Sequence, residues 1–401
     1  MSNPSLTLST TCQCEPATPP ARLWSLGAAY FFYFMALGAI FPFLPLYYAR
    51  LGLNDEQIGL LAAVVTAVSV PMSLVWGTLA DNVSSERRLL QAILLGVALA
   101  LFALSRVDSF ALVFVVVIVY GALNSATVPL LDGLTIESVR AYGRSSFGEI
   151  RVWGSIGWTL ATLLTGKILE WTFFEMFFWL GIGLLVMTFF TTPFHPERGQ
   201  RAKASLREGV RDVLKPPFTF MLAALLLLGI AMSAANNFYS LFLNRMGASE
   251  TLVGVAWAIG SLSEIPVVFY ASRLTQRFGS ARILQVAFLV FALRWFLYVV
   301  SPSPGWAVAV QVLHGLSFGT FLVGSMGLLA ELIPSERRAT AQFLFMGTVY
   351  GLGSLFGATS GGMFVERFGV RALYMVTPLL ALAGWGVFVA TVQRRLQQKT
   401  V

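Results

Sequence analysis

Several ionisable side chains stand inside long apolar stretches of the sequence: Glu264, Arg294 and His314 in the second half, Asp132 and Arg151 in the first. Charges are costly in hydrocarbon, so such groups usually face a protein interior or a water-filled cavity. A carboxylate and an imidazole on neighbouring helices can exchange protons and partners as the helices shift. We therefore interpret Glu264, His314, Arg294 and Asp132 as proton-coupling residues. The simpler alternative is a static ion pair that fixes helix packing, or an Arg294 that extends to the head groups.

Uncharged polar groups and one aromatic ring complete a candidate substrate site. Asp132 and Arg151 are expected at similar depth on antiparallel neighbours, where they can pair. Trp158 lies two helical turns after Arg151 on the same face, where it could stack on a substrate ring. The alternative for the amides is hydrogen bonding that only joins helices. The predicted substrate-binding residues are Asp132, Arg151, Trp158, Asn236, Asn237 and Gln311.

The composition requires a membrane to position these side chains. Of the 401 residues, 57% are hydrophobic and 11% are charged, whereas soluble domains carry about 25% charged residues. Apolar runs of about 18 residues or more predict membrane-spanning helices. We expect an all-α membrane protein with twelve such helices in two six-helix bundles, at about residues 24–49, 56–80, 88–105, 109–137, 147–169, 172–193, 217–244, 250–272, 282–300, 305–332, 338–365 and 371–393.

The two bundles are predicted to be copies of one unit. At an offset of 194 residues, Glu137 matches Glu331 and Gly157 matches Gly351. An even number of crossings per copy relates the copies by an axis along the membrane normal, with a substrate site between them near the midplane. The predicted organisation is a disordered cytoplasmic tail (1–22), an N-terminal bundle (23–193), a cytoplasmic linker (194–216), a C-terminal bundle (217–394) and a cytoplasmic tail (395–401).

The basic residues predict the orientation. Of the 27 lysines and arginines, 20 fall on the side that holds both termini and six on the other side. Basic loops stay in the cytoplasm, so we expect a multi-pass protein of the cell inner (plasma) membrane with both termini cytoplasmic. The excess of positive charge then reflects topology, and nucleic-acid binding is not expected. Cys12 and Cys14 have no second pair at zinc spacing, so we expect neither a metal nor a cofactor.

A loop motif follows the second predicted helix. The sequence reads Gly77-Thr78-Leu79-Ala80-Asp81, followed by Glu86-Arg87-Arg88. It resembles the loop signature between helices 2 and 3 of the major facilitator superfamily, and the resemblance covers residues 24–393. It implies that Asp81, Arg87 and Arg88 steady the outward-open state by charge pairing, and that Gly77 permits close approach of helices.

Within that superfamily, the sequence resembles the 3-phenylpropionic acid transporter and lactose permease branch. The stretch from Phe147 to Gly157 and the pairs Arg294-Trp295 and His314-Gly315 carry this resemblance. It implies that Glu264, Arg294 and His314 serve proton coupling. It also implies that Asp132, Arg151 and Trp158 bind substrate. Lactose permease has a glutamate one turn after its histidine, where this chain has Ser317, so Glu264 or Asp132 becomes the better proton-site candidate.

These observations favour a proton-coupled symporter of a small organic solute, working by alternating access. A carboxylate would suit Arg151 or Arg294, and a sugar or nucleoside would suit Asp132 and Trp158. The expected partners are this substrate, protons and the lipid bilayer, and we expect a monomer. A drug or metabolite efflux antiporter is the alternative, although the fifth predicted helix lacks the proline of the antiporter pattern. A lipid translocase or a membrane enzyme is a remote alternative, since no loop gathers catalytic side chains.

Overall fold

In a computed structural model of the protein, residues 21–83, 85–142, 146–192 and 213–393 are described. They form helices joined by short turns, and no strand occurs among them. The all-α prediction is therefore confirmed. The predicted tails, apart from residues 21 and 22, and most of the predicted linker lie outside the described residues.

The helices of the first half pack as one bundle, in which α1 lies against α7 and α8 and α3 lies against α5. Pro45 stands at the start of α2 and separates it from α1, because proline cannot continue a helix but fits its first turn. The bounds are α1 Ala21–Ile40, α2 Leu44–Arg50, α3 Asp55–Asn82, α4 Glu86–Leu104, α5 Phe110–Asn124, α6 Thr127–Tyr142, α7 Phe147–Trp171 and α8 Met176–Thr191.

The second half forms another bundle, in which α10 lies against α18 and α19 and α14 lies against α16 and α19. Its bounds are α10 Phe218–Asn237, α11 Tyr239–Arg245, α12 Glu250–Phe269, α13 Ala271–Phe278, α14 Ser280–Val299, α15 Pro304–Val310, the π-helix η1 Gly315–Gly319, α16 Thr320–Leu332, the 3-10 turn η2 Ser335–Arg337, α17 Arg338–Met346, the π-helix η3 Gly347–Leu352, α18 Gly353–Phe368, α19 Val370–Phe388 and the π-helix η4 Val389–Gln393.

The helices have the length and composition of membrane spans. Among the described residues, ten helical stretches are long and apolar enough to cross a membrane. The 16-residue apolar α8 and the 25-residue α7, which carries Glu149, Arg151, Lys167 and Glu170, fill the two remaining predicted positions. The architecture is consistent with twelve spans in two bundles, as the sequence predicted.

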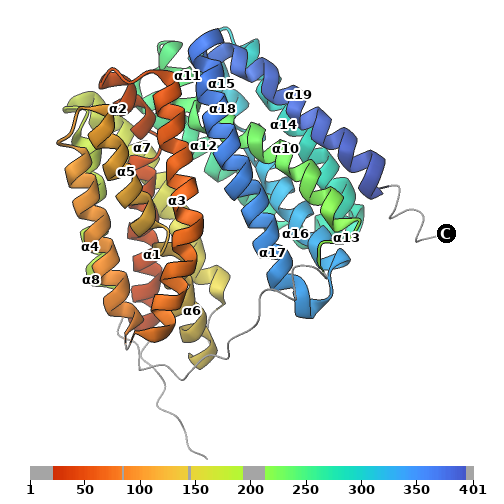
Figure 1. Ribbon diagram of the computed structural model, residues 1–401, viewed down its shortest axis with the longest axis horizontal. Coiled ribbons are helices and arrows are strands. Elements are labelled where there is room, and N and C mark those ends of the chain that lie inside the picture. The colour runs from red at the N-terminus through yellow and green to blue at the C-terminus, as the bar shows by residue number, and fades with distance from the viewer. Residues whose placement is uncertain (1–20, 84, 143–145, 193–212, 394–401) are drawn as a thin grey trace, which may run out of the picture.

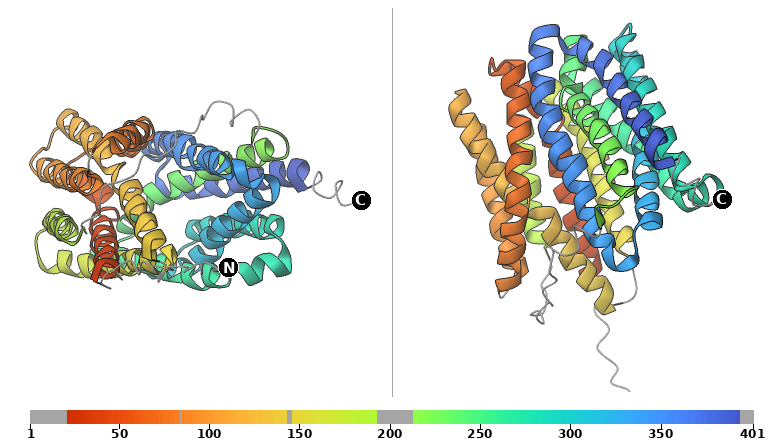
Figure 2. Two further views of the ribbon diagram at one scale, coloured as in Figure 1. Left: turned by 90° about the horizontal axis from the view of Figure 1, so that it is seen from below. Right: turned by 45° about the vertical axis from the view of Figure 1, so that its right-hand side comes forward.

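The two bundles meet at one end of their helices and diverge toward the other (Figure 1). The most extensive contacts between them are α3 with α18 and α7 with α12, and α2 also contacts α11. Glycines permit the first two, because a Cβ on Gly59 would lie 2.5 Å from the Ala358 carbonyl oxygen and a Cβ on Gly254 would lie 2.1 Å from that of Thr162. Seen along the helices, the two bundles lie side by side (Figure 2, left). We call the end that carries α2, α11 and these contacts the closed end.

The α1–α7 contact within the first bundle also depends on a glycine, which yields a stability prediction. A Cβ on Gly157 would lie 2.2 Å from the Phe31 carbonyl oxygen, so Gly157→Ala must push the two backbones apart. We expect a loss of roughly 1–3 kcal/mol of unfolding free energy and a lower unfolding temperature of the purified protein. Gly183 in α8 has nothing within 4 Å of an added Cβ, so Gly183→Ala is the matched control. Equal unfolding temperatures for the two variants would contradict the packing described.

Candidate functional site

Three charged or polar side chains on three different helices form one hydrogen-bonded row. Arg294 of α14 contacts Nδ1 of His314 through Nη1. Nε2 of His314 lies 2.9 Å from Oε1 of Glu264 on α12. The structure thus brings together Glu264, His314 and Arg294, which the sequence singled out from their depth in separate spans. We call these three residues the charged row.

The partners of His314 determine where its proton lies. A guanidinium has only donors, so Nδ1 must accept from Arg294. Nε2 then carries the hydrogen and donates it to the Glu264 carboxylate. The row therefore contains a neutral imidazole between one positive and one negative charge. A proton added at Nδ1 would displace the hydrogen bond from Arg294 and place a second positive charge beside it, so the imidazole is neutral in this arrangement.

Glycines and a π-helix position His314 close to α12. A Cβ on Gly315 would lie 1.8 Å from the Ser263 carbonyl oxygen, so only glycine fits there. The Gly315 amide also donates to Ser263 Oγ at 2.8 Å. The π-helix η1 begins at this residue, and such irregular turns are frequent at functional sites.

The Glu264 end of the row faces the other half. Trp257, Ser261 and Glu264 lie four and then three residues apart, on one face of α12. Ser261 Oγ accepts a hydrogen bond of 3.2 Å from Thr159 of the first half. The side chain of Glu264 is 28% exposed and that of His314 is 15% exposed, whereas Arg294 is 2% exposed. The carboxylate is therefore the accessible end of the row, and the guanidinium is buried in the second bundle.

The predicted charges of the first half are arranged around Tyr30. Its hydroxyl donates to Oδ1 of Asp132 at 2.5 Å. The guanidinium of Arg151 lies 4.0 Å from the Phe34 ring centroid and 5.5 Å from that of Tyr30. No ion pair joins Asp132 and Arg151 in the part of the chain that the structure describes. The two side chains, which the sequence placed at similar depth, are instead linked through Tyr30, whose hydroxyl binds Asp132 and whose ring lies beside Arg151.

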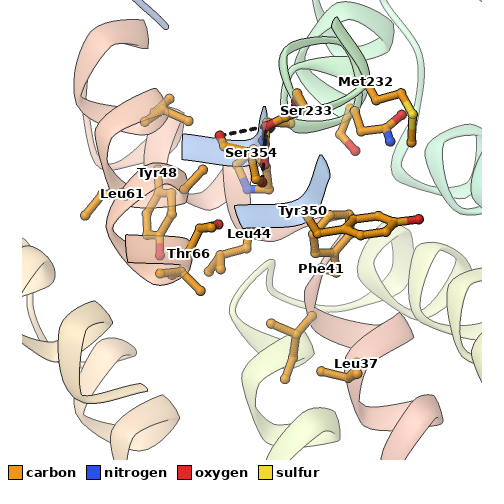
Figure 3. A pocket seen from close by; sticks show the side chains of 18 of the residues that line it. Leu37, Phe41, Leu44, Tyr48, Leu61, Thr66, Met232, Ser233, Tyr350 and Ser354 are labelled. Atoms are coloured by element: carbon orange, nitrogen blue, oxygen red, sulfur yellow. Dashed lines mark hydrogen bonds between the residues drawn. The ribbon is translucent and has the colours of Figure 1, made fainter. Parts of the chain in front are cut away.

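A cavity of about 450 Å3 lies between the two halves. Figure 3 shows side chains of the first half, including Tyr48 and Thr66, and of the second, including Ser233, Tyr350 and Ser354, around the same space. Asn236 and Asn237, two of the predicted substrate-binding residues, line this cavity. Trp158 packs behind the wall, with its ring centroid 5.9 Å from that of the lining residue Phe41.

Gln311 does not belong to this cavity. It is 5% exposed, and its Oε1 accepts a hydrogen bond of 2.9 Å from Tyr298 inside the second bundle. The structure therefore places it as a buried link between α14 and the end of α15. Conversely, sequence reasoning missed the lining residues Tyr48, Tyr120 and Tyr350. Tyr350 lies in the π-helix η3, and no sequence pattern predicts that the helix becomes a π-helix there.

The predicted gating loop lies at the end of the helices where the bundles diverge (Figure 1). A Cβ on Gly77 would meet nothing within 4 Å in this structure, and the close helix approach expected there in the outward-open state stays a prediction. Nε of Arg87 donates to the Thr192 carbonyl oxygen at 3.0 Å. Asp81 lies one residue before the end of α3, and Arg88 lies in the first turn of α4. No group of three or more potential metal ligands occurs among the described residues.

Comparisons with known proteins agree with this architecture. The family model described as the MFS_1 like family matches residues 23–376. The maltose permease of Geobacillus stearothermophilus is 31% identical over 359 residues, covering 88% of this chain and 91% of the permease. The probable 3-phenylpropionic acid transporter of Escherichia coli (strain K12) is 26% identical over 318 residues, covering 78% and 83%.

Solved structures show the same fold. The crystal structure of the nucleoside transporter NupG superposes with a TM-score of 0.82 at 19% identity, covering 92% of this chain and 98% of that one. A bacterial homolog of the human lysosomal transporter Spinster, in an inward-facing and unoccupied conformation, gives a TM-score of 0.74 at 15% identity, covering 92% and 97%. The chain therefore belongs to the MFS_1 like family of major facilitator superfamily transporters.

Proposed function

We propose that the protein is a proton-coupled symporter that moves a small organic solute into the cell by alternating access. The observation that carries the proposal is the charged row, because it places one accessible carboxylate at the end of a hydrogen-bonded path to a buried guanidinium. Buried ionisable groups in transporters commonly mark proton pathways. The permease and transporter relatives support transport of a sugar or an organic acid.

The row offers a way to couple proton binding to motion. With Glu264 ionised, its charge is balanced by Arg294 through the neutral His314. With Glu264 protonated, the carboxyl group is neutral and its attraction to the row weakens. A proton and a solute that bind together can then shift the equilibrium between two arrangements of the bundles, provided that each binds one arrangement better. Asp132, hydrogen-bonded to Tyr30, is the second candidate for the proton site.

The arrangement of the bundles supports alternating access. With the predicted orientation, the closed end faces outward and the cavity between the halves belongs to an inward-facing state. The loop that contains Asp81, Arg87 and Arg88 lies at the opposite end, where it would close the outward-facing state. Uptake is the proposed direction, because α7 is an uninterrupted helix without the proline of the drug-antiporter pattern.

Replacing Glu264, the proposed proton acceptor, should affect uphill accumulation of solute and exchange of solute differently. Glu264→Gln mimics the protonated carboxyl group, so it should abolish uphill accumulation driven by a proton gradient. Exchange of solute across the membrane requires no net proton release and should survive at least in part. Both are measured in proteoliposomes with radiolabelled maltose and, separately, 3-phenylpropionate, the solutes named for the two relatives.

Glu175→Gln is the matched control, because Glu175 is exposed at the start of α8 and far along the chain from the row. It should accumulate solute like the parent protein. If Glu264→Gln also accumulates solute against its gradient, the row is not the proton site, and Asp132→Asn becomes the next variant to measure.

A further inference from the structure

The lining of the cavity between the halves contains no charged residue. Its 23 lining residues include hydroxyls, amides and aromatic rings but no Asp, Glu, Lys, Arg or His. An ionised ligand that leaves water for such a cavity loses its hydration and gains no counter-charge. The cavity therefore disfavours a carboxylate solute.

The arginines that would suit a carboxylate are engaged elsewhere. Arg294 is 2% exposed and contacts His314. Arg151 lies against the rings of Phe34 and Tyr30. Neither residue lines the cavity, so neither is placed to neutralise an anion bound there.

Hydrogen-bonding groups occur on both walls of the cavity. Thr66 and Asn124 line the wall of the first half, and Ser233, Asn236, Asn237 and Ser354 line that of the second. Amides and hydroxyls can each donate and accept, which is what a solute with many hydroxyl groups requires. Polar groups on opposite walls suit a solute that carries polar groups on all of its sides.

Some of the donors and acceptors of these asparagines bond within the protein, and the others remain available to a ligand. Asn237 Nδ2 donates to Ser233, at 2.9 Å to its carbonyl oxygen and 3.1 Å to its Oγ, which leaves Asn237 Oδ1 as an acceptor. Asn124 Oδ1 accepts from Tyr33 at 3.0 Å, which leaves its amide as a donor. Asn236 makes no side-chain hydrogen bond to any described residue, so both of its functions remain available to a ligand.

Aromatic rings provide the apolar part of the site. Phe41 and Trp257 line the cavity, with ring centroids 5.3 Å apart and planes at 89°. Trp257 Nε1 donates to Ser240 Oγ at 3.0 Å, which fixes the indole ring. A fixed ring offers a flat apolar surface to the face of a solute ring at little entropic cost.

We propose that this cavity is the substrate site and that it takes a neutral saccharide, held by Asn124, Asn236 and Asn237 and packed against Phe41 and Trp257. A nucleoside is also neutral and hydrogen-bonds through both its ribose and its base, so uridine is the competing occupant that the binding test must exclude. The inference rests on the proposed function, since it names the solute of that transporter. It places the site in the uncharged cavity and not at Asp132 and Arg151.

Binding to the purified full-length protein tests the proposal. Maltose, sucrose, uridine and 3-phenylpropionate are compared by isothermal titration calorimetry. We expect binding of at least one of the two saccharides. Asn236→Leu should weaken it about ten-fold, because the lost hydrogen bonds are made in a desolvated site. Asn244→Leu is the matched control: Asn244 lies on α11, is exposed and does not line the cavity. It should bind like the parent protein.

Three results would overturn the proposal: binding of 3-phenylpropionate or uridine without a saccharide, binding of none of the four probes, or equal effects of the two asparagine variants. Failure of the proton mechanism is distinguishable from these results. Glu264→Gln should leave saccharide binding within a few-fold of the parent, whatever its effect on accumulation.

A second inference comes from a ten-residue motif at the closed end, which recurs 195 residues later. The segments are Arg50-Leu51-Gly52-Leu53-Asn54-Asp55-Glu56-Gln57-Ile58-Gly59 and Arg245-Met246-Gly247-Ala248-Ser249-Glu250-Thr251-Leu252-Val253-Gly254. In each, the arginine ends a helix, a glycine with φ near +80° to +90° follows, and an Asn or Ser caps the next helix. The positive φ explains the glycine.

The charges of the two motifs pair crosswise between the halves. Arg50 Nη2 lies 2.5 Å from Oε1 of Glu250, and Arg245 Nη2 lies 2.6 Å from Oδ1 of Asp55. Each arginine thus contacts the acid of the other motif. We call these two ion pairs the clasp.

Two further carboxylates also bind across the two halves, one from each half. Oε2 of Glu366 accepts from the Asp55 amide at 2.8 Å, and Oε1 of Glu170 accepts from the Thr251 amide at 3.3 Å. Each carboxylate lies at the N-terminus of a helix of the other half, where negative charge is favourable. All these contacts require the halves to be together at this end.

We propose that the clasp holds the closed end shut. The arginines of the two pairs are 48% and 40% exposed, and ion pairs that reach water are individually weak, so each pair changes the ratio of closed to open molecules only about two- to five-fold. Such a clasp favours the closed state while leaving it readily reversible, which a carrier that cycles between two states requires.

Cysteine labelling tests the clasp. The two native cysteines, Cys12 and Cys14, are replaced by serine, and Ala62→Cys places a reporter in the cavity wall. In intact cells, a membrane-impermeant maleimide added outside reaches this reporter when the closed end opens. Arg50→Glu or Arg245→Glu should each speed labelling several-fold. Combining Arg50→Glu with Glu250→Arg should restore much of the parent rate.

Arg106→Glu is the control, because Arg106 is exposed at the same end and stacks on Phe102 and Trp179 of its own half. It should leave the labelling rate unchanged. Unchanged labelling in the single clasp variants, an equal effect of Arg106→Glu, or no recovery in the charge swap would each overturn the proposal. The readout involves no transport, so it is independent of the proton mechanism.

Discussion

The buried guanidinium of Arg294 is the charge on which the arrangement of the second bundle depends. A charge at the centre of a membrane costs about 2.5–3.5 kcal/mol on insertion scales, and Arg294 is 2% exposed. Its Nε is buried without a partner among the described residues, so the contact from Nη1 to His314 is the direct one. The compensating negative charge of Glu264 is reached only through the imidazole. The three helices must therefore stay close together, and Gly315 permits this by removing the side chain that would meet α12.

Because the three charged-row residues bind one another, they and the neutral polar groups of the cavity have separate roles. The charged row satisfies its own charges, and its accessible end is a carboxylate. The cavity between the halves has neutral polar groups on both walls. A proton and a neutral solute can thus bind at separate places that both face the interface between the bundles. Motion at that interface, where glycines bring α3 to α18 and α7 to α12, would change both sites at once.

Much of this arrangement could be predicted from the sequence, and the remainder has physical reasons for escaping prediction. The spans and the members of the row were evident because charges inside apolar runs are rare. The face that each helix turns toward the cavity could not be predicted, since a helix that is apolar on all sides gives no periodic signal. For this reason Gln311 was assigned to the substrate site although it faces Tyr298, and Tyr48, Tyr120 and Tyr350 were missed. The clasp could have been found, because its motif recurs at a constant spacing with charges in equivalent positions.

The central claim is that solute and proton move together, and proton flux is its most direct measure. Purified protein in lightly buffered proteoliposomes, without an imposed pH gradient, is given maltose or sucrose on the outside while external pH is recorded. The account predicts that the external medium becomes more alkaline as the sugar enters, at a rate that follows sugar uptake. Sugar uptake at full rate with an unchanged external pH would contradict it.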